Sequence, residues 1–443
     1  MHDPLNILSR LKSGGIVRAF RHRDFAIYSI ASWFSDNGMW MMRIGMGWLT
    51  WDLTHSGAWL GIIVLSQALP SVFLVPFAGA MADRIDRVLI MRVTITISIV
   101  IASTLSALTW AGYFNIWTLL GFAVVHGIAG TMAVPARVTI GPNLVPRADI
   151  SAAIGVSSTL FGSATFLGPA IAGILITQVG IGFTFAGNAI ANTLLVLALG
   201  VIKVARSERN ANHGSILSDV VEGIRYAGGH PGILPTLMLA TFSALLVRPL
   251  GDLMPGIADT VFGRGADGLA TLMACMGVGG MFGSFWLANR NRITGMSSIF
   301  LYGTVVYALS TAAFAASSHF TLGMVFMVIV GGSQSISNNA SQILIQNAVA
   351  GSMRARIMSL YSYNYRTMPA LGALAMGAAA NSIGFQIPVG VGAILLLGTL
   401  IWAFRRRDAM RNSLETIVED GPPDIVSGHV PRDPKSPGSK AAV

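Results

Sequence analysis

The sequence predicts an all-α integral membrane protein with twelve transmembrane helices, arranged as two six-helix bundles. Charged residues make up only 11% of the 443 residues and hydrophobic residues 53%, whereas a typical soluble protein is about 25% charged. So few charges cannot cover a soluble surface of this size, and the apolar surface must face lipid. Twelve apolar runs of crossing length and matching positions in the two halves support the same fold class.

Twelve segments are long and apolar enough to cross the hydrocarbon core, which takes roughly 20 residues of helix. Six of them precede a polar gap and six follow it. We expect the spans at 25–50, 56–80, 88–110, 115–137, 151–177, 181–203, 233–257, 267–288, 296–317, 320–347, 357–380 and 384–404.

Three segments lie outside the spans. Residues 1–24 form a basic N-terminal segment. The linker 204–232 separates a bundle at 25–203 from a bundle at 233–404, and its apolar positions predict a short helix on the membrane surface. The tail 405–443 is rich in Pro, Gly, Ser and charge, which predicts disorder.

The basic residues indicate the orientation. If the N-terminus is cytoplasmic, 25 of the 29 Lys and Arg residues lie in cytoplasmic segments, and only Arg264 lies in an outside loop. This bias follows the positive-inside rule and predicts that both termini are cytoplasmic. It also accounts for the formal net charge of +10, so we expect a multi-pass protein whose surroundings are the lipid bilayer and which has no nucleic-acid partner.

The two halves are related to each other. Since both begin on the same side of the membrane, their pseudo-two-fold axis runs along the membrane normal, an arrangement known among secondary transporters. Three pairs of similar positions are offset by 205 or 206 residues: Arg43 and Arg248, Gly127 and Gly332, and Asp83 and Asn289.

The loop between the second and third spans reads Gly79-Ala-Met-Ala-Asp83-Arg84-Ile-Asp86-Arg87. Gly79 allows a neighbouring helix to approach closely, and Asp83 can accept from N–H groups at a helix start. Arg84 and Arg87 can pair with carboxylates across the loop. We interpret these four residues as a cytoplasmic gate motif. A solvated loop with ordinary positive-inside charge is the alternative.

This G-x-x-x-D-R-x-x-R pattern after the second of twelve spans resembles the signature loop of the major facilitator superfamily. Other segments resemble its branch of transmembrane secretion effectors, which includes macrolide efflux proteins and the enterobactin exporter. These segments are Ser35–Trp40, Pro135-Ala136-Arg137, Gly168–Gly173 and Arg354–Tyr361. The resemblance covers roughly residues 20–405 and implies a transporter in the bacterial inner membrane.

The chain departs from the pattern of these relatives at two places. Asn289 stands where a carboxylate would complete the loop motif in the second half, and no arginine lies near His126, where many related drug:proton antiporters carry one.

Ionisable side chains inside spans are costly, so each is a candidate for function. Asp36 and Arg43 are seven residues apart, so they share a helix face at a rise of about 10.5 Å and line one wall rather than pair. Arg248 and Asp252 are four apart and can pair directly. Arg366 lies in the middle of the eleventh span.

Each of these groups has a functional and a structural interpretation. Asp36 is a proton carrier or substrate contact, or else a protonated carboxyl that packs helices. Arg43 and Arg248 form an outer gate or an anion-attracting vestibule, or else extend to the outer headgroups. Arg366 is a candidate for the central cavity, because it lies deeper in its span and extends less easily to the headgroups. His126 titrates near neutrality, but a packed polar role suits a lone histidine equally.

Further polar and helix-breaking residues complete the candidate set. Gln334 and Asn338 in the tenth span and Tyr365 in the eleventh are candidates for the cavity lining, although polar residues also join helices in membranes. Gly168 and Pro169 predict a kink in the fifth span, which suits rocking of the bundle or is purely structural.

These observations favour a secondary active transporter that works by alternating access. The leading hypothesis is a monomeric, proton-coupled exporter of a drug-like or siderophore-like amphipathic small molecule, with protons as the driving ion. No phosphate-binding loop motif occurs, no catalytic constellation is present, and the single Cys275 provides no thiolate cluster, so we expect no enzyme activity, cofactor or metal. An importer or facilitator of a small metabolite and a non-transporting receptor are the alternatives.

Overall fold

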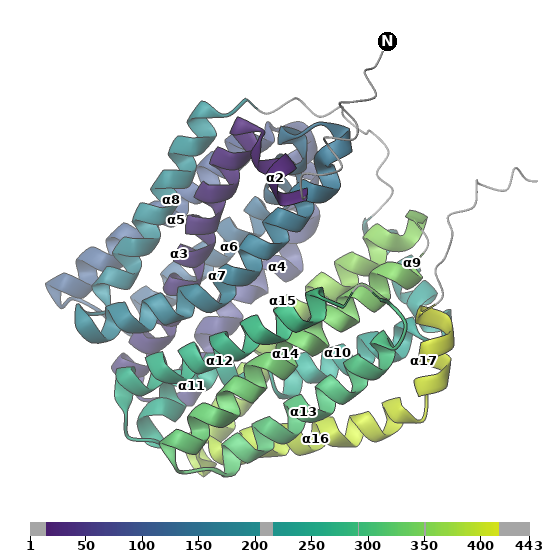
Figure 1. Ribbon diagram of the computed structural model, residues 1–443. Coiled ribbons are helices and arrows are strands. Elements are labelled where there is room, and N and C mark those ends of the chain that lie inside the picture. The colour runs from purple at the N-terminus through teal and green to yellow at the C-terminus, as the bar shows by residue number, and fades with distance from the viewer. Residues whose placement is uncertain (1–14, 204–215, 291, 350, 416–443) are drawn as a thin grey trace, which may run out of the picture.

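The computed structural model describes residues 15–203, 216–290, 292–349 and 351–415, and these form a helical chain (Figure 1). The first half contains α2 (Gly15–Phe20), α3 (Arg23–Thr54), α4 (Gly57–Arg84), α5 (Arg87–Ala111), α6 (Ile116–Ile140), α7 (Ile150–Gln178) and α8 (Gly182–Val201). Between α6 and α7 lie two short 3-10 turns, η1 (Pro142–Leu144) and η2 (Arg147–Asp149).

The helix α9 (Ile216–Gly229) follows in the linker. The second half contains α10 (Ile233–Leu246), α11 (Leu250–Thr260), α12 (Gly265–Ala288), α13 (Met296–Ala316), α14 (Phe320–Ala348), α15 (Gly351–Ile383), α16 (Gln386–Phe404) and α17 (Arg407–Leu414).

The long helices account for the twelve predicted spans. Ten described segments are long and apolar enough to cross a membrane, with Ile233–Thr260 counted as one. The other two long helices are α3, with 32 residues, and α15, with 33. Both exceed the length that a crossing needs. They are less apolar because they carry the candidate charges Asp36, Arg43 and Arg366.

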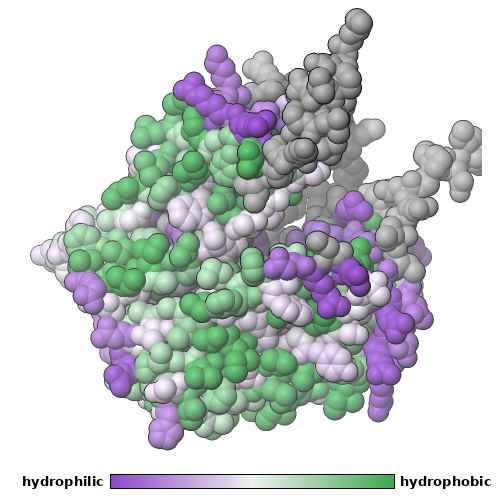
Figure 2. All heavy atoms as spheres, in the orientation of Figure 1, coloured by the Kyte–Doolittle hydropathy of each residue, from purple (hydrophilic) through white to green (hydrophobic). Residues whose placement is uncertain are grey.

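The helices form two bundles that pack side by side. In the first half α3 packs on α7 and α8, and α4 packs on α6, whereas in the second half α14 packs on α12 and α13, and α13 packs on α16. The main contacts between the halves join α4 to α15 and α7 to α12 (Figure 1). Hydrophobic residues cover the sides of the helices, and hydrophilic residues gather near the helix ends (Figure 2).

The seventh predicted span is broken into α10 and α11. The break falls at Val247-Arg248-Pro249. Proline lacks a backbone N–H and disfavours helical geometry in the residue before it. The chain therefore turns at Arg248 and restarts as α11, which changes the direction in which the side chains on the two segments point.

The tail is more ordered near its start than the sequence predicted. Residues 407–414 form α17, in which Met410 and Leu414 are fully buried against the second half. Glu415 accepts hydrogen bonds from the N–H groups of Gly295 and Ser297 at the start of α13. The prediction of disorder from residue 405 was therefore wrong for residues 405–415, because two apolar residues among many charges gave too weak a pattern.

A helix, α9, lies in the linker, and its predicted place on the membrane surface stays a prediction. Glu222 of α9 pairs with Arg356 of α15 at 2.8 Å, and Ala227 is buried. Gly223 faces Leu360 of α15. The helix is therefore held against the second half through small residues and an ion pair.

The two ends of the bundle are distinguished by their connections. We call the end that holds α2, α9 and α17 the termini side, and the end that holds the α3–α4, α11–α12 and α15–α16 connections the far side (Figure 1).

Candidate functional site

Asp36 of α3 pairs with Arg137 of α6. The guanidinium Nη2 lies 2.7 Å from the carboxylate Oδ1, and the side chains are 8% and 31% exposed for Asp36 and Arg137. A buried carboxylate without a partner would be costly in a membrane protein. Arg137 therefore balances the charge of Asp36 while its own side chain stays accessible.

The sequence interpretation missed Arg137 as a site residue, because it was counted among the cytoplasmic charges. The helix α6 continues to Ile140, so Arg137 lies in its last turn. The sequence could have identified Arg137, because the predicted fourth span, 115–137, ends at this residue. A charge inside a span is a candidate for function.

Arg43 of α3 pairs with Asp252 of α11 across the boundary between the halves. Its Nε and Nη2 donate to Oδ1 of Asp252 at 3.0 and 2.7 Å. The Asp252 side chain is 10% exposed and that of Arg43 is 43% exposed. The predicted pairing of Arg248 with Asp252 was wrong, because the break at Pro249 removes the helical spacing on which it depended.

Arg248 instead stacks on Tyr365 of α15, with its guanidinium carbon 3.3 Å from the centre of the ring. Its Nη1 is buried and has no hydrogen-bond partner among the described residues. Guanidinium groups stack well on aromatic faces, and the attraction grows when the pair is shielded from water. Tyr365 itself is 40% exposed.

Arg366 is exposed and forms no ion pair within the described part of the chain. Its charge interacts with those of Arg137 and Arg43, both of which belong to the first half. Its side chain therefore faces the boundary between the halves rather than lipid. Four arginines and two carboxylates thus converge here, which leaves an excess of positive charge. We call these residues the arginine cluster: Asp36, Arg43, Arg137, Arg248, Asp252 and Arg366.

The structure also gives the surroundings of three other candidate residues, His126, Gln334 and Asn338. Nδ1 of His126 is buried without a hydrogen-bond partner among the described residues. The Gln334 amide donates to the hydroxyl of Tyr307 at 2.7 Å. The backbone carbonyl of Asn338 accepts from Tyr361 at 3.1 Å. The last two contacts lie within the second half, so their role in lining a cavity stays a prediction.

The predicted gate motif is only partly described. The side chains of Gly79, Asp83 and Arg84 lie outside the described residues. Arg87 is the first residue of α5, and the carboxylate of Asp86 accepts from the N–H groups of Val88 and Leu89. Asp86 therefore caps this helix, which was the role that the sequence interpretation gave to Asp83.

Gly168 and Pro169 lie within the continuous helix α7. A Cβ atom at Gly168 would lie 2.5 Å from Cβ of Trp40 on α3. The glycine therefore permits close packing of α7 on α3, and the predicted kink stays a prediction.

Several contacts join the two halves at the far side. Nε1 of Trp51 donates to Oδ2 of Asp259 at 2.9 Å, and the Trp51 ring packs edge-on against Phe385. The N–H of Gly57 donates to Oδ1 of Asn381 at 2.8 Å. These contacts hold the two halves together at the far side and block access from that side to the arginine cluster.

A model of the family described as transmembrane secretion effector matches residues 15–427. The chain belongs to this family of the major facilitator superfamily. This result confirms the resemblance and the transporter class that the sequence predicted, and it confirms that the protein is not an enzyme.

Relatives of this chain include transporters from Staphylococcus aureus and Streptococcus pyogenes. The staphyloferrin A transporter of Staphylococcus aureus (strain NCTC 8325 / PS 47) is 23% identical over 379 residues, which cover 84% of this chain and 93% of the relative. Macrolide efflux protein A of Streptococcus pyogenes is 22% identical over 360 residues, which cover 79% of this chain and 86% of the relative.

Solved structures of transporters share the fold of this chain. A bacterial homolog of the human lysosomal transporter Spinster, in an inward-facing and unoccupied conformation, has a TM-score of 0.69 at 14% identity and covers 90% of this chain and 99% of its own. The nucleoside transporter NupG has a TM-score of 0.66 at 13% identity, with coverage of 87% and 99%.

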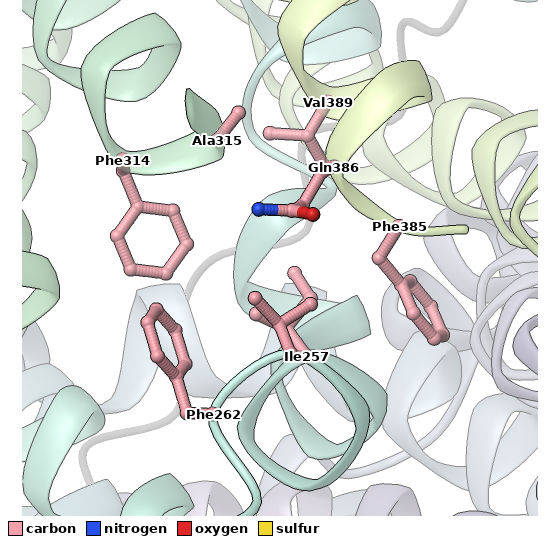
Figure 3. Close-up of a pocket in the computed structure, with 8 residues that line it drawn as sticks. Ile257, Phe262, Phe314, Ala315, Phe385, Gln386 and Val389 are labelled. Carbon is pink, nitrogen blue, oxygen red and sulfur yellow. The ribbon is translucent and has the colours of Figure 1, made fainter. Parts of the chain in front are cut away.

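A separate apolar pocket lies near the far side of the second half of the chain (Figure 3). Phe262, Phe314 and Phe385 surround it, and the amide of Gln386 points into it. Its cavity volume of about 10 Å³ is that of about one water molecule. This pocket is therefore too small to hold a transported solute, and the arginine cluster is the candidate site.

Proposed function

We propose that this transporter is a proton-coupled exporter that moves an amphipathic anion through the arginine cluster by alternating access. The observation that carries the proposal is the position of Arg366, an exposed cation without an ion-pair partner among the described residues, beside two ion pairs at the boundary between the halves. A solute that brings a negative charge would balance Arg366, and Tyr365 would offer it an aromatic surface.

The described conformation supports a cycle of this kind. The far side is closed by the Trp51–Asp259 and Gly57–Asn381 contacts, yet Arg43 is 43% exposed. Water therefore reaches the cluster from the termini side. If the termini are cytoplasmic, as the positive-inside bias predicts, this is an inward-facing state, as in the solved Spinster homolog.

The substrate class follows from charge and from the relatives. The cluster holds more guanidinium groups than carboxylates, which favours an anion in a site of low dielectric constant. Two relatives are named for staphyloferrin A transport and for macrolide efflux. We therefore propose a siderophore-like or drug-like amphipathic molecule that carries at least one carboxylate or phosphate.

Asp36 is the proton carrier in this proposal. Its ion pair with Arg137 favours the ionised carboxylate while the termini side is open. The pair lies within the first half, so its separation requires α3 to shift against α6 as the far side opens. That shift would leave a buried carboxylate without a cation, and such a group takes up a proton. A proton would then enter on Asp36 while the substrate leaves.

A proton-coupled importer is the second candidate, and one contact favours it. Asp36 and an anionic solute compete for the same Arg137, so protonation of Asp36 would free Arg137 for the solute. Proton and anion would then bind together and move in the same direction.

Proteoliposomes distinguish these mechanisms. The purified protein would be given an amphipathic fluorescent carboxylate as the probe, and proton flux would be followed with a pH-sensitive dye. Proton flux opposite to the probe supports export by antiport, and flux in the same direction supports the importer. Probe movement without proton flux, unchanged in Asp36→Asn, contradicts the coupling.

We further propose that the protein lies in the bacterial inner membrane with both termini in the cytoplasm and that one chain forms the complete pathway. The proposal rests on the distribution of basic residues and on the presence of both bundles in one chain. Reporter fusions after residue 443 and within the α11–α12 connection test it, since they should report opposite sides of the membrane.

A further inference from the structure

A second cavity lies at the termini side of the second half, between α13, α16 and α17. Its volume is about 260 Å³. It is formed by the start of α13 and the end of α16, where two helices leave the apolar region of the membrane. None of its lining residues belongs to the arginine cluster, so the transport pathway does not account for it.

One wall of this cavity is polar and carries both signs of charge. Arg407, Arg411 and Asp408 of α17 line it, and Nε of Arg407 lies 3.6 Å from Oδ1 of Asp408. Two guanidinium groups and one carboxylate leave an excess of one positive charge. Arginine presents donors in a fork that matches phosphate oxygens.

Ser297 provides an independent sign of a ligand. It lines the cavity and is only 2% exposed, and its hydroxyl has no hydrogen-bond partner among the described residues. A buried hydroxyl without a partner costs free energy. Glu415 already accepts from the backbone N–H of Ser297, so a ligand would meet the side-chain hydroxyl rather than the helix start. Donors on Arg407, Arg411 and Ser297 together call for a ligand rich in acceptor oxygens.

The other wall is apolar and continuous with the side of the bundle. Tyr302 is 58% exposed and packs edge-on against Phe404, with ring centres 5.5 Å apart. Farther along α16, Ile401 is 63% exposed. Aromatic residues of this kind are common at the level of lipid headgroups. Figure 2 shows hydrophilic residues over the α17 region next to the hydrophobic surface of the bundle.

We propose that this cavity binds the headgroup of an anionic phospholipid. The phosphodiester accepts from Arg407, Arg411 and the Ser297 hydroxyl, and its single negative charge matches the excess charge of the wall. The acyl chains lie along Tyr302, Phe404 and the apolar side of α16. A bound lipid therefore joins α17 to α13 at the membrane surface.

Native mass spectrometry of the full-length protein in detergent tests the site, with phosphatidylglycerol as the probe. We expect Arg407→Gln and Arg411→Gln each to weaken retention of one lipid roughly tenfold, because each removes a charge-assisted contact. Arg405→Gln is the matched control, since Arg405 is exposed on the same segment and does not line the cavity. Equal retention in all variants would overturn the proposal.

A second variant separates lipid binding from folding. Ser297→Ala removes a hydroxyl that has no partner, so the lipid-free protein should keep or raise its unfolding temperature, while the stabilisation by added phosphatidylglycerol should fall. Equal stabilisation by phosphatidylethanolamine would overturn selectivity for anionic lipid. Equal stabilisation by millimolar inorganic phosphate alone would show that the ligand is a soluble anion and would overturn the lipid assignment.

Discussion

Arg43 of α3 donates two hydrogen bonds to one carboxylate oxygen of Asp252 on α11, and this contact joins the two halves of the transporter. The two residues are 209 positions apart in the sequence. Neither half contains the whole ion pair, because each half supplies one of its two charges. A transporter that opens its far side must separate α3 from α11, so this ion pair stabilises the far-closed state.

Removing the pair should favour opening of the far side. The Arg43 side chain is 43% exposed, so we expect Asp252→Asn to shift the balance by about 1 kcal/mol, or roughly fivefold. The measurement is maleimide labelling of Ala373→Cys in a Cys275→Ser background, since Ala373 is fully buried where α15 meets α4. Labelling should be faster in Asp252→Asn. The exchanged pair Arg43→Asp with Asp252→Arg should restore slow labelling, and its failure to do so would count against a direct interaction.

The Asp36–Arg137 pair should respond asymmetrically to mutation. Asp36 is 8% exposed and Arg137 is 31% exposed, so an unpaired Asp36 has less access to water than an unpaired Arg137. We expect Arg137→Met to lower the stability of the protein by about 3 kcal/mol and Asp36→Asn to lower it less. Thermal unfolding of the purified variants measures both effects.

Acidification provides the control for this second prediction. Protonation of Asp36 removes the unpaired charge in Arg137→Met, so the difference from the wild type should shrink as the pH falls. A difference that is the same at every pH would show that Arg137 acts through packing and not through its charge.

His230 predicts a pH dependence outside the membrane spans. Its Nδ1 accepts from the N–H groups of Gly232 and Ile233 at the start of α10, and burial lowers the pKa of its imidazole below the ordinary value of 6.5. Only the neutral ring can accept these bonds. Because the unfolded chain binds the proton more readily, the stability from this group is complete above about pH 6.5 and is lost as the pH falls towards the folded pKa.

The variant His230→Ala isolates this effect. It should be less stable than the wild type at pH 8, and the difference should narrow as the pH falls below 6.5. Thermal unfolding of both proteins over this pH range is the measurement. His319→Ala is a suitable comparison, because His319 precedes α14 on the far side and does not take part in the contacts of His230. Parallel curves for the wild type and His230→Ala would contradict the prediction.

The fold was predictable from the sequence because the membrane limits the choices. Each span needs about 20 apolar residues, and the predicted spans coincide with the long helices within a few residues in most cases. The break at Pro249 and the helix α17 were not predicted. Both depend on local packing, which hydropathy does not record.

The candidate site was predictable only as a set of residues, not as a set of contacts. Charges inside spans identified Asp36, Arg43, Arg248, Asp252 and Arg366 one by one. Their partners depend on how helices from different parts of the chain meet, and the sequence does not show this. The partner of Arg43 was therefore not predicted, and Arg137 was missed because it lies at a helix end.

The glycines where α4 meets α15 provide a test of alternating access. A Cβ atom at Gly61 would lie 2.6 Å from the carbonyl oxygen of Ala373 on α15, too close for the backbone to tolerate without a shift. This contact lies between the halves, so it exists only while the far side is closed. Gly61→Ala should therefore favour the far-open state and slow transport of the carboxylate probe by more than tenfold, with little loss of thermal stability. Hydrogen exchange should become faster at the start of α4 and at the end of α15.

Two other glycines separate this effect from simple misfolding. Gly279 packs on the Val328 carbonyl within the second half, and this contact is needed in every state, so Gly279→Ala should lower the unfolding temperature markedly. Gly121 on α6 has open space around it, so Gly121→Ala should change neither transport nor stability. If Gly61→Ala instead loses stability like Gly279→Ala and keeps its exchange pattern at the far side, then α4 and α15 stay packed throughout the cycle, and the far side does not open at this contact.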